Sequence, residues 1–229
     1  MRAGAIIAAA GRGNRLRREE PKALVMLAGL PLVVRAALPF QRCPLVEEIV
    51  VVAPEGNLED VGTWVRRCSL SKIHAVVPGG PQRQDSVGRG LEALRGAEVV
   101  LVHDGARPLL EEGLVGRVAQ AAAEYGAVVP ALPVHDTLKR VRGGLIEQTV
   151  DRTGIWVAQT PQGFRIELLR AAHARARAEG FYGTDDAVLV ERLGHPVHVV
   201  PGSARNLKIT TPEDLLVAEA LLRWPEESE

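Results

Sequence analysis

The stretch AGAIIAAAGRGNRLRREEPK, residues 3–22, decides the fold. It opens with an apolar run at residues 5–10, which is too short for a helix of ordinary length and ends at Gly11. Such a run is typical of a strand that is buried on both faces of a parallel sheet. The sequence therefore predicts an α/β fold with its first strand at residues 5–10.

A glycine-rich basic loop follows this strand. Gly11 and Gly13 alternate with arginines at positions 12, 15, 17 and 18, and Lys22 comes soon after. Glycines let backbone N–H groups approach an anion, while the cations neutralise it. Ligands of open α/β sheets bind at the carboxyl ends of the strands. We therefore interpret the segment as a polyphosphate loop, the alternative being a surface turn with solvated arginines.

Two common phosphate-binding motifs do not match this loop. A dinucleotide loop would have a third glycine where this chain has Leu16, which disfavours a nicotinamide-dependent enzyme. A P-loop would end in Gly-Lys followed by Ser or Thr, and the stretch has no such sequence.

The composition of the 229 residues narrows the class of protein. Lys plus Arg and Asp plus Glu number 28 each, and a neutral total argues against a nucleic-acid binder, which normally has a basic excess. Cys43 and Cys68 are too few for a disulfide framework or a cysteine-rich zinc site. No run of 18 apolar residues occurs, and the first strand follows Met1 closely. We therefore expect no membrane span, no signal peptide and a cytoplasmic protein.

Strand and helix patterns alternate along most of the chain. Apolar runs predict further strands at residues 46–53, 73–77, 99–102, 127–132 and 197–201. Helical periodicity predicts helices at residues 32–40, 58–67, 86–95, 112–125, 166–178, 185–193 and 212–223. Thr184 and Thr211 are expected to cap the last two helices. The alternation predicts one Rossmann-like domain over residues 1–229, with a mostly parallel twisted sheet flanked by helices.

Residues 134–156 interrupt this alternation. Residues 134–141 and 145–150 look extended and flank Gly143-Gly144, which predicts a β-hairpin arm. The arm is polar, and an isolated two-stranded hairpin is marginally stable. We therefore expect a second copy of the chain to hold it, in a homodimer that exchanges arms about a two-fold axis.

Short motifs follow the opening loop. They are Gly79-Gly80…Asp85-Ser86-Val87, His103-Asp104-Gly105-Ala106-Arg107-Pro108, Gln159-Thr160-Pro161-Gln162, Thr184-Asp185-Asp186 and Asn206-Leu207-Lys208-Ile209-Thr210. With AAAGRGNRL…PK they resemble the sugar- and alcohol-phosphate nucleotidyltransferases. Within these, nearly the whole chain resembles the 2-C-methyl-D-erythritol 4-phosphate cytidylyltransferase family. The resemblance implies a Mg²⁺-dependent enzyme of the non-mevalonate isoprenoid pathway. It would form 4-diphosphocytidyl-2-C-methyl-D-erythritol and pyrophosphate from CTP and 2-C-methyl-D-erythritol 4-phosphate.

Nucleotidyl transfer joins two anions, so we look for cations and a metal ligand rather than for a catalytic triad. The resemblance assigns the cytosine edge to Gly80 and Ser86, and the ribose to Ala106. Asp104, at the tip of an apolar strand, is the expected Mg²⁺ ligand. The triphosphate is assigned by the resemblance to three catalytic cations and to the loop backbone: Arg15, Lys22, Lys208, Ala9, Ala10, Gly11 and Gly13.

The resemblance also assigns residues to the acceptor, a small polyol phosphate. They are Arg107, Thr137, Arg152, Thr160, Thr184 and Asp185. Thr137 and Arg152 are expected to reach the acceptor from the opposite subunit, and the arginine fork suits a phosphate. Gly105 stands where the family has alanine. Arg205 stands where the family more often has aspartate, so it receives no function, and His103 is interpreted as a packed core residue.

Two other functions stay open at this point. A relative that uses ribitol 5-phosphate shares nearly all of these motifs, and the side chains around Thr137, Arg152 and Thr160 would decide between the acceptors. A non-catalytic nucleotide-binding module would be expected to lack a reactive cation or Asp104, and this chain has them all.

Overall fold

The computed structural model describes residues 1–11, 13–16 and 20–224. Its strands are β1 (Ala3–Ala8), β2 (Met26–Leu27), β3 (Leu30–Pro31), β4 (Val46–Ala53), β5 (Ile73–Pro78), β6 (Val99–Asp104), β7 (Ala127–Pro133), β8 (Leu138–Arg142), β9 (Leu145–Val150), β10 (Trp156–Ala158), β11 (Gln162–Arg165) and β12 (His198–Pro201). Its helices are α1 (Leu32–Arg42), α2 (Leu58–Arg67), α3 (Arg83–Ala93), α4 (Glu112–Tyr125), α5 (Ile166–Ala178), α6 (Ala187–Arg192) and α7 (Pro212–Arg223), with 3-10 turns η1 (Asn14–Leu16), η2 (Lys22–Leu24) and η3 (Glu55–Asn57).

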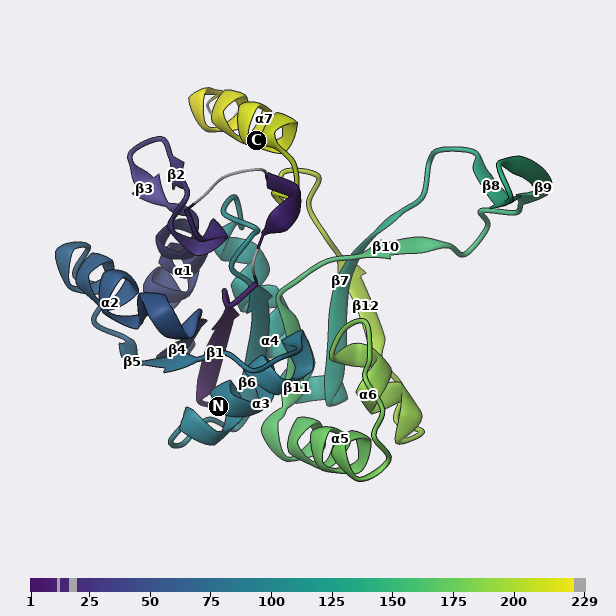
Figure 1. Ribbon diagram of the computed structural model, residues 1–229. Helices are drawn as coiled ribbons and strands as arrows, with labels where there is room; N and C mark the ends of the chain where they lie inside the picture. Colours follow the sequence, from purple (N-terminus) through teal and green to yellow (C-terminus); the bar gives the residue numbers. More distant parts are fainter. Residues whose placement is uncertain (12, 17–19, 225–229) are drawn as a thin grey trace.

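A central sheet organises these elements (Figure 1). Its described strands lie in the order β10-β7-β11-β6-β1-β4-β5, and β12 also pairs with β7. β1 is parallel to β4 and β6, and β4 is parallel to β5, whereas β11 runs antiparallel between β6 and β7. The expected single α/β domain with a mostly parallel sheet, flanked by helices, is thus confirmed.

Several details differ from the expectations: β2 and β3 were not predicted, α3 runs over Arg83–Ala93 rather than residues 86–95, and β8 begins at Leu138 rather than at residue 134. β10 and β11 were not predicted, because strands of three and four residues are too short to show a period; they form by pairing along β6 and β7. The first strand ends at Ala8 rather than at residue 10. Thr184 does not cap α6: Asp186 is the N-cap residue, and the Val188 N–H donates to Asp185 Oδ1 at 3.1 Å.

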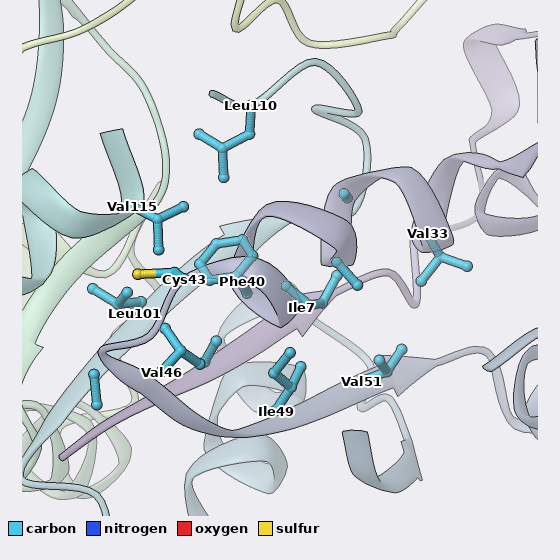
Figure 2. Packing of buried hydrophobic residues seen from close by; sticks show 14 of the residues in the cluster. Ile7, Val33, Phe40, Cys43, Val46, Ile49, Val51, Leu101, Leu110 and Val115 are labelled. Atoms are coloured by element: carbon cyan, nitrogen blue, oxygen red, sulfur yellow. The ribbon is translucent and has the colours of Figure 1, made fainter. Parts of the chain in front are cut away.

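Side chains of β1 alternate between the two faces of the sheet. Ile7 joins an apolar cluster with Phe40 of α1 (Figure 2). Ile6 joins the cluster on the other face, with Val87 of α3 and Leu169 of α5. Complete burial of a side chain of this size stabilises the fold by about 1.5–3 kcal/mol. Packing from both sides therefore fixes the strand that leads into the basic loop.

A third apolar cluster ties the loop after β1 to the C-terminal helix. Leu16 is 2% exposed and belongs to the same cluster as Ile209 and Leu215. Thr211 and Asp214 form the predicted capping box at the start of α7. Within the described part of the chain, no helix combines the length and apolar character needed to cross a membrane.

Gly90 of α3 provides a test of the contact between helix and sheet. A Cβ at Gly90 would lie 2.6 Å from Ile6 Cγ2, so Gly90→Ala should lower the free energy of unfolding by about 1–3 kcal/mol. Gly116→Ala in α4 is the matched control, because apart from its own helix backbone no described atom lies within 4 Å of that Cβ position. The free energy of unfolding of Gly116→Ala should rise by about 0.5–1 kcal/mol, because alanine has the higher helix propensity. Equal stability of the two variants in urea unfolding would contradict the close packing.

Candidate active site

A cavity of about 350 Å³ opens at the carboxyl ends of β1 and β6. Ala8 and Asp104, the last residues of these strands, are register partners, and the Gly105 N–H donates to Ala8 O at 2.9 Å. Most of the residues that the sequence assigned to the nucleotide line this cavity: Ala9, Ala10, Gly11, Lys22, Gly80, Ser86, Asp104, Ala106 and Lys208.

An ion pair between Asp104 and Lys208 lies at the edge of this cavity. Lys208 Nζ is 2.7 Å from Asp104 Oδ2, and the Ile209 N–H donates to Ala106 O at 2.8 Å, which ties the lysine segment to the end of β6. Burial opposes the ionisation of Asp104, but Arg83 and Lys208 outweigh it and hold the pKa of the carboxyl well below its ordinary value. The carboxylate is therefore charged at neutral pH.

Lys22 brings a second ammonium group to the same cavity. Gly13 has φ +66°, and a Cβ there would lie 2.6 Å from Lys22 Cβ, so a glycine is needed both for the turn and for the close approach. Burial, and then the charge of Lys208, lower the pKa of Lys22. Two cations that repel each other in one partly buried cavity favour a polyanionic ligand.

Ser86 fixes the turn that was assigned to base recognition. The Gly80 N–H donates to Ser86 Oγ at 3.1 Å, and the Ser86 hydroxyl donates to Gln82 O at 3.1 Å. Gln82 and Asp85 form a capping box at the start of α3. The backbone that would face a base is thus set by its own hydrogen bonds.

A second cavity of about 230 Å³ adjoins the first, and its described lining shares Arg83, Asp104 and Lys208 with it. Four residues assigned to the acceptor line it: Arg107, Thr160, Thr184 and Asp185. The Arg107 guanidinium donates to Asn206 O at 2.7 Å, which also gives this arginine a structural role. Within the described structure, Arg107 Nε and Asn206 Oδ1 are buried and have no hydrogen-bond partner.

His103 is a packed core residue, as predicted, and it orients Thr160. Its Nε2 is 3.0 Å from Arg107 O, a carbonyl that can only accept, so Nε2 carries the proton and Nδ1 accepts from the Thr160 hydroxyl at 2.9 Å. The Asp104 N–H in turn donates to Thr160 Oγ1 at 3.1 Å. Burial lowers the pKa of His103 to about 4, which keeps the ring neutral.

The structure does not bring every predicted residue to the cavities. Arg15 is exposed and outside the lining of both, although its charge contributes to the lowered pKa of Lys22. Gly13 contacts Lys22 without lining a cavity. Thr137 and Arg152 are exposed on the arm, which projects from the domain (Figure 1), and Arg152 Nη1 donates to His135 O. The loop arginines at positions 12, 17 and 18 lie outside the described residues.

Four side chains that hold the site together received no individual role from the sequence, although three of them stand in its motifs: Arg83, Gln159, Gln162 and Asp186. Gln162 Oε1 accepts from the N–H groups of Asp186 and Ala187, at 3.1 Å each. Gln159 Nε2 donates to Ser203 O at 2.9 Å. Because α3 begins at Arg83 rather than at residue 86, this cation stands in the first turn, where the helix dipole opposes it and favours an acidic partner; the predicted bounds hid that signal.

The described residues offer limited support for a metal ion. Among them, no group of three or more His, Cys, Asp and Glu side chains is arranged to hold one. Asp104 is the carboxylate in the described lining of the first cavity, and its two oxygens already contact Arg83 and Lys208. Mg²⁺ usually takes one or two carboxylates plus phosphates and water. This donor set therefore fits an ion carried mainly by a bound polyphosphate.

Comparisons with known proteins agree with these motifs. The family model described as 2-C-methyl-D-erythritol 4-phosphate cytidylyltransferase matches residues 3–224. Proteins of that name from Geobacillus kaustophilus and Pelotomaculum thermopropionicum are 45% and 48% identical, covering 95% and 96% of this chain and 96% and 93% of their own lengths. The crystal structure of the Thermus thermophilus protein of that name has a TM-score of 0.84 and 42% identity, covering 98% of this chain and 100% of that one.

The buried His103 predicts a pH dependence of folding stability. Its folded pKa of about 4 lies below the ordinary 6.5, so the stability from its neutral form is complete above pH 6.5 and is lost as the pH falls toward 4. Between pH 7 and 4 the unaltered chain should lose about 3 kcal/mol more of its free energy of unfolding than His103→Gln. Urea unfolding at several pH values measures this, with His135→Gln on the exposed arm as control. Parallel curves for the unaltered chain and His103→Gln would contradict the assignment.

Proposed function

Because the chain belongs to the 2-C-methyl-D-erythritol 4-phosphate cytidylyltransferase family, we propose that it makes 4-diphosphocytidyl-2-C-methyl-D-erythritol in isoprenoid biosynthesis. A phosphate oxygen of 2-C-methyl-D-erythritol 4-phosphate attacks the α-phosphorus of CTP. The bond to the β-phosphate breaks, and pyrophosphate leaves with that electron pair. The observation that carries this proposal is the convergence of Lys22, Lys208 and the charged Asp104 where β1 and β6 end.

Each cavity has a part in this reaction. The nucleotide occupies the first, with cytosine at Gly80 and Ser86 and ribose at Ala106. Lys22, Lys208 and Arg15 stabilise the negative charge that grows on the α-phosphoryl oxygens and the leaving group. No general base is needed, because the attacking phosphate is already ionised. The acceptor occupies the second cavity, with Arg107, Thr160, Thr184 and Asp185. Their shared border supports this division, since the attacking oxygen must meet the α-phosphorus there.

The substrates can be tested by following pyrophosphate release. CTP, UTP, ATP and GTP are each combined with 2-C-methyl-D-erythritol 4-phosphate or ribitol 5-phosphate. CTP with the methylerythritol phosphate should have the highest kcat/KM. UTP should be poorer by at least about a hundredfold, because a wrong base leaves polar groups of the site unpaired. Preference for ribitol 5-phosphate would assign the chain to the other acceptor, and no release in any combination would contradict the proposed reaction.

Mg²⁺ is part of the proposal, with Asp104 as the protein's carboxylate near the ion. When bound, the ion would neutralise charge on the triphosphate and the departing pyrophosphate. Asp104→Asn should raise the Mg²⁺ concentration needed for half-maximal activity several-fold, because the amide is a weaker ligand than the carboxylate. Asp60→Asn on the exposed face of α2 is the matched control. An unchanged metal titration with a lower maximal rate would contradict a role of Asp104 near the ion. Asp104 would then serve only to hold Lys208.

A homodimer with exchanged arms is the last part of the proposal. The support is that Thr137 and Arg152 lie outside the cavities of their own chain, on an arm with exposed apolar side chains. Lys22 then acts in its own subunit and Arg152 in the neighbour. Lys22→Ala and Arg152→Ala proteins should each be nearly inactive.

Unfolding and reannealing these two variants together should restore about a quarter of the normal activity, because half of the dimers are mixed and each of these has one intact site. Lys22→Ala annealed with Lys208→Ala is the matched control. Both of these lysines act in the same subunit, so each site of a mixed dimer lacks one of them. No recovery in the first mixture, once heterodimers are verified, would show that the arm does not act across subunits. Recovery in the control would show that Lys22 and Lys208 do not act in the same subunit.

A further inference from the structure

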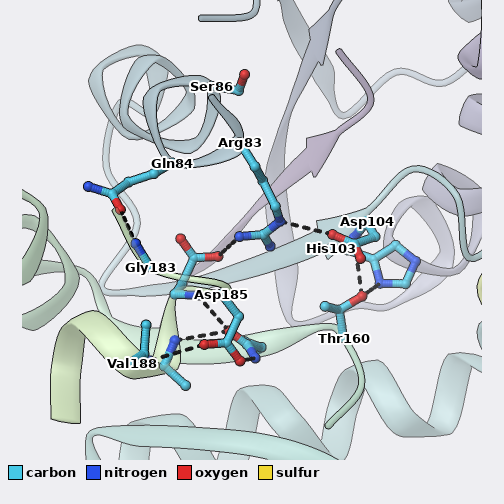
Figure 3. A network of polar contacts seen from close by, with 12 residues as sticks. Arg83, Gln84, Ser86, His103, Asp104, Thr160, Gly183, Asp185 and Val188 are labelled. Carbon is cyan, nitrogen blue, oxygen red and sulfur yellow. Dashed lines mark hydrogen bonds and ion pairs between the residues drawn. The ribbon is translucent and has the colours of Figure 1, made fainter. Parts of the chain in front are cut away.

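Arg83, the first residue of α3, lies between two carboxylates that belong to distant parts of the chain (Figure 3). Its Nε is 3.1 Å from Asp104 Oδ1 on β6, and its Nη1 is 2.6 Å from Asp186 Oδ2 at the start of α6. The side chain also lines both cavities. The guanidinium thus joins the site to the polar segment that precedes α6.

Asp186 is a fixed anchor for this arginine. Its side chain is 1% exposed. His173 Nε2 donates to Asp186 Oδ1 at 3.3 Å, and the Asp186 N–H donates to Gln162 Oε1 at 3.1 Å. Burial opposes its ionisation, but Arg83 and His173 hold the pKa of Asp186 below its ordinary value. Because His173 holds one carboxylate oxygen and Gln162 holds the backbone N–H, Asp186 keeps its place without Arg83.

Asp104, at the other end, is held less completely. Its backbone N–H donates to Thr160, but its carboxylate contacts the side chains of Arg83 on one oxygen and Lys208 on the other. The Lys208 side chain is 45% exposed. The direction in which Asp104 presents its second oxygen therefore depends on Arg83, and the position of the Lys208 ammonium depends on that oxygen.

We propose that Arg83 is a positioning residue for the cytidylyl transfer: it anchors Asp104 on Asp186 and thereby holds Lys208 where the two cavities meet. This inference rests on the proposed function. Arg83 acts through Asp104 and Lys208 rather than by bonding the reacting atoms. Two carboxylates on different elements need a forked cation, which explains an arginine in the first turn of a helix, where the dipole disfavours positive charge.

A double-mutant cycle tests this route. Arg83→Gln alone should lower kcat by roughly ten- to a hundredfold, as expected when a reacting group is displaced by about 1 Å, with the KM for CTP changed less than about threefold. In an Asp104→Asn background the same change should lower kcat by less than about threefold, because the contact it acts through is already lost. Arg83→Lys should not restore the rate, since one ammonium cannot reach both carboxylates. Arg170→Gln, on the exposed side of α5, is the control and should have no effect in either background.

Three results with these variants in solution would overturn the inference. Equal losses from Arg83→Gln in both backgrounds would mean that Arg83 acts directly on the substrates. Normal turnover of Arg83→Gln would mean that Lys208 does not need it. In the double variant Arg83→Gln/Asp186→Asn we expect stability to recover and turnover to stay low. If both recovered, Arg83 would only support the fold.

A crystal structure of Arg83→Gln gives a readout that does not depend on the reaction. Lys208 Nζ should lie more than about 4 Å from Asp104 Oδ2, beyond ion-pair distance. An unchanged Asp104–Lys208 contact in that crystal overturns the inference even if turnover is low. Failure of the proposed function would be seen separately, as a lack of pyrophosphate release by the unaltered chain.

Discussion

The carboxylate of Asp104, held between Arg83 and Lys208, is the contact on which the rest of the site depends. At about 4 Å and an effective dielectric constant near 20, two unit charges interact by about 4 kcal/mol. A mostly buried carboxylate needs that compensation, because desolvation alone would favour its neutral form. The two cations would repel each other without it. The three charged side chains Arg83, Asp104 and Lys208 are thus stable only together. Their net charge is positive, so the site is already positive before a phosphate binds.

The topology of the sheet explains where this unit forms. From β1 the chain builds outward through β4 and β5, and then returns to place β6 on the other side of β1. The carboxyl ends of β1 and β6 therefore form the switch point of the sheet, where open α/β folds bind ligands. The Ala8–Asp104 register fixes the basic loop beside the carboxylate, and Ile209 brings Lys208 to the same place through its bond to Ala106. The pairing of β1 with β6 and the contact between Ile209 and Ala106 thus place the basic loop, Asp104 and Lys208 at the same edge of the sheet.

Much of the fold could be read from local patterns, whereas the contacts within the site could not. The strand Val46–Ala53 and the helices Leu58–Arg67 and Glu112–Tyr125 match their predicted bounds, because the strand contains an apolar run and each helix carries a helical apolar period. The residues that line the first cavity were mostly found as motifs. The Arg83–Asp186 pair was missed because it joins residues 103 positions apart, and no periodicity encodes such a contact. β10 and β11 escaped for the same reason, since pairing with neighbouring strands defines them rather than their own sequence.

The arm connects stability with function in the proposed homodimer. Leu145 and Ile146 are 75% and 64% exposed, and Trp156 and Val157 at its base are 49% and 55% exposed, although side chains of these kinds are mostly buried in proteins. A partner that covered them would gain about 25 cal/mol per Å² of apolar surface. The same contact would carry Arg152 to an acceptor that its own chain's cavities leave without it. Assembly would then stabilise the hairpin and complete the site in one step, so that isolated subunits would lack both.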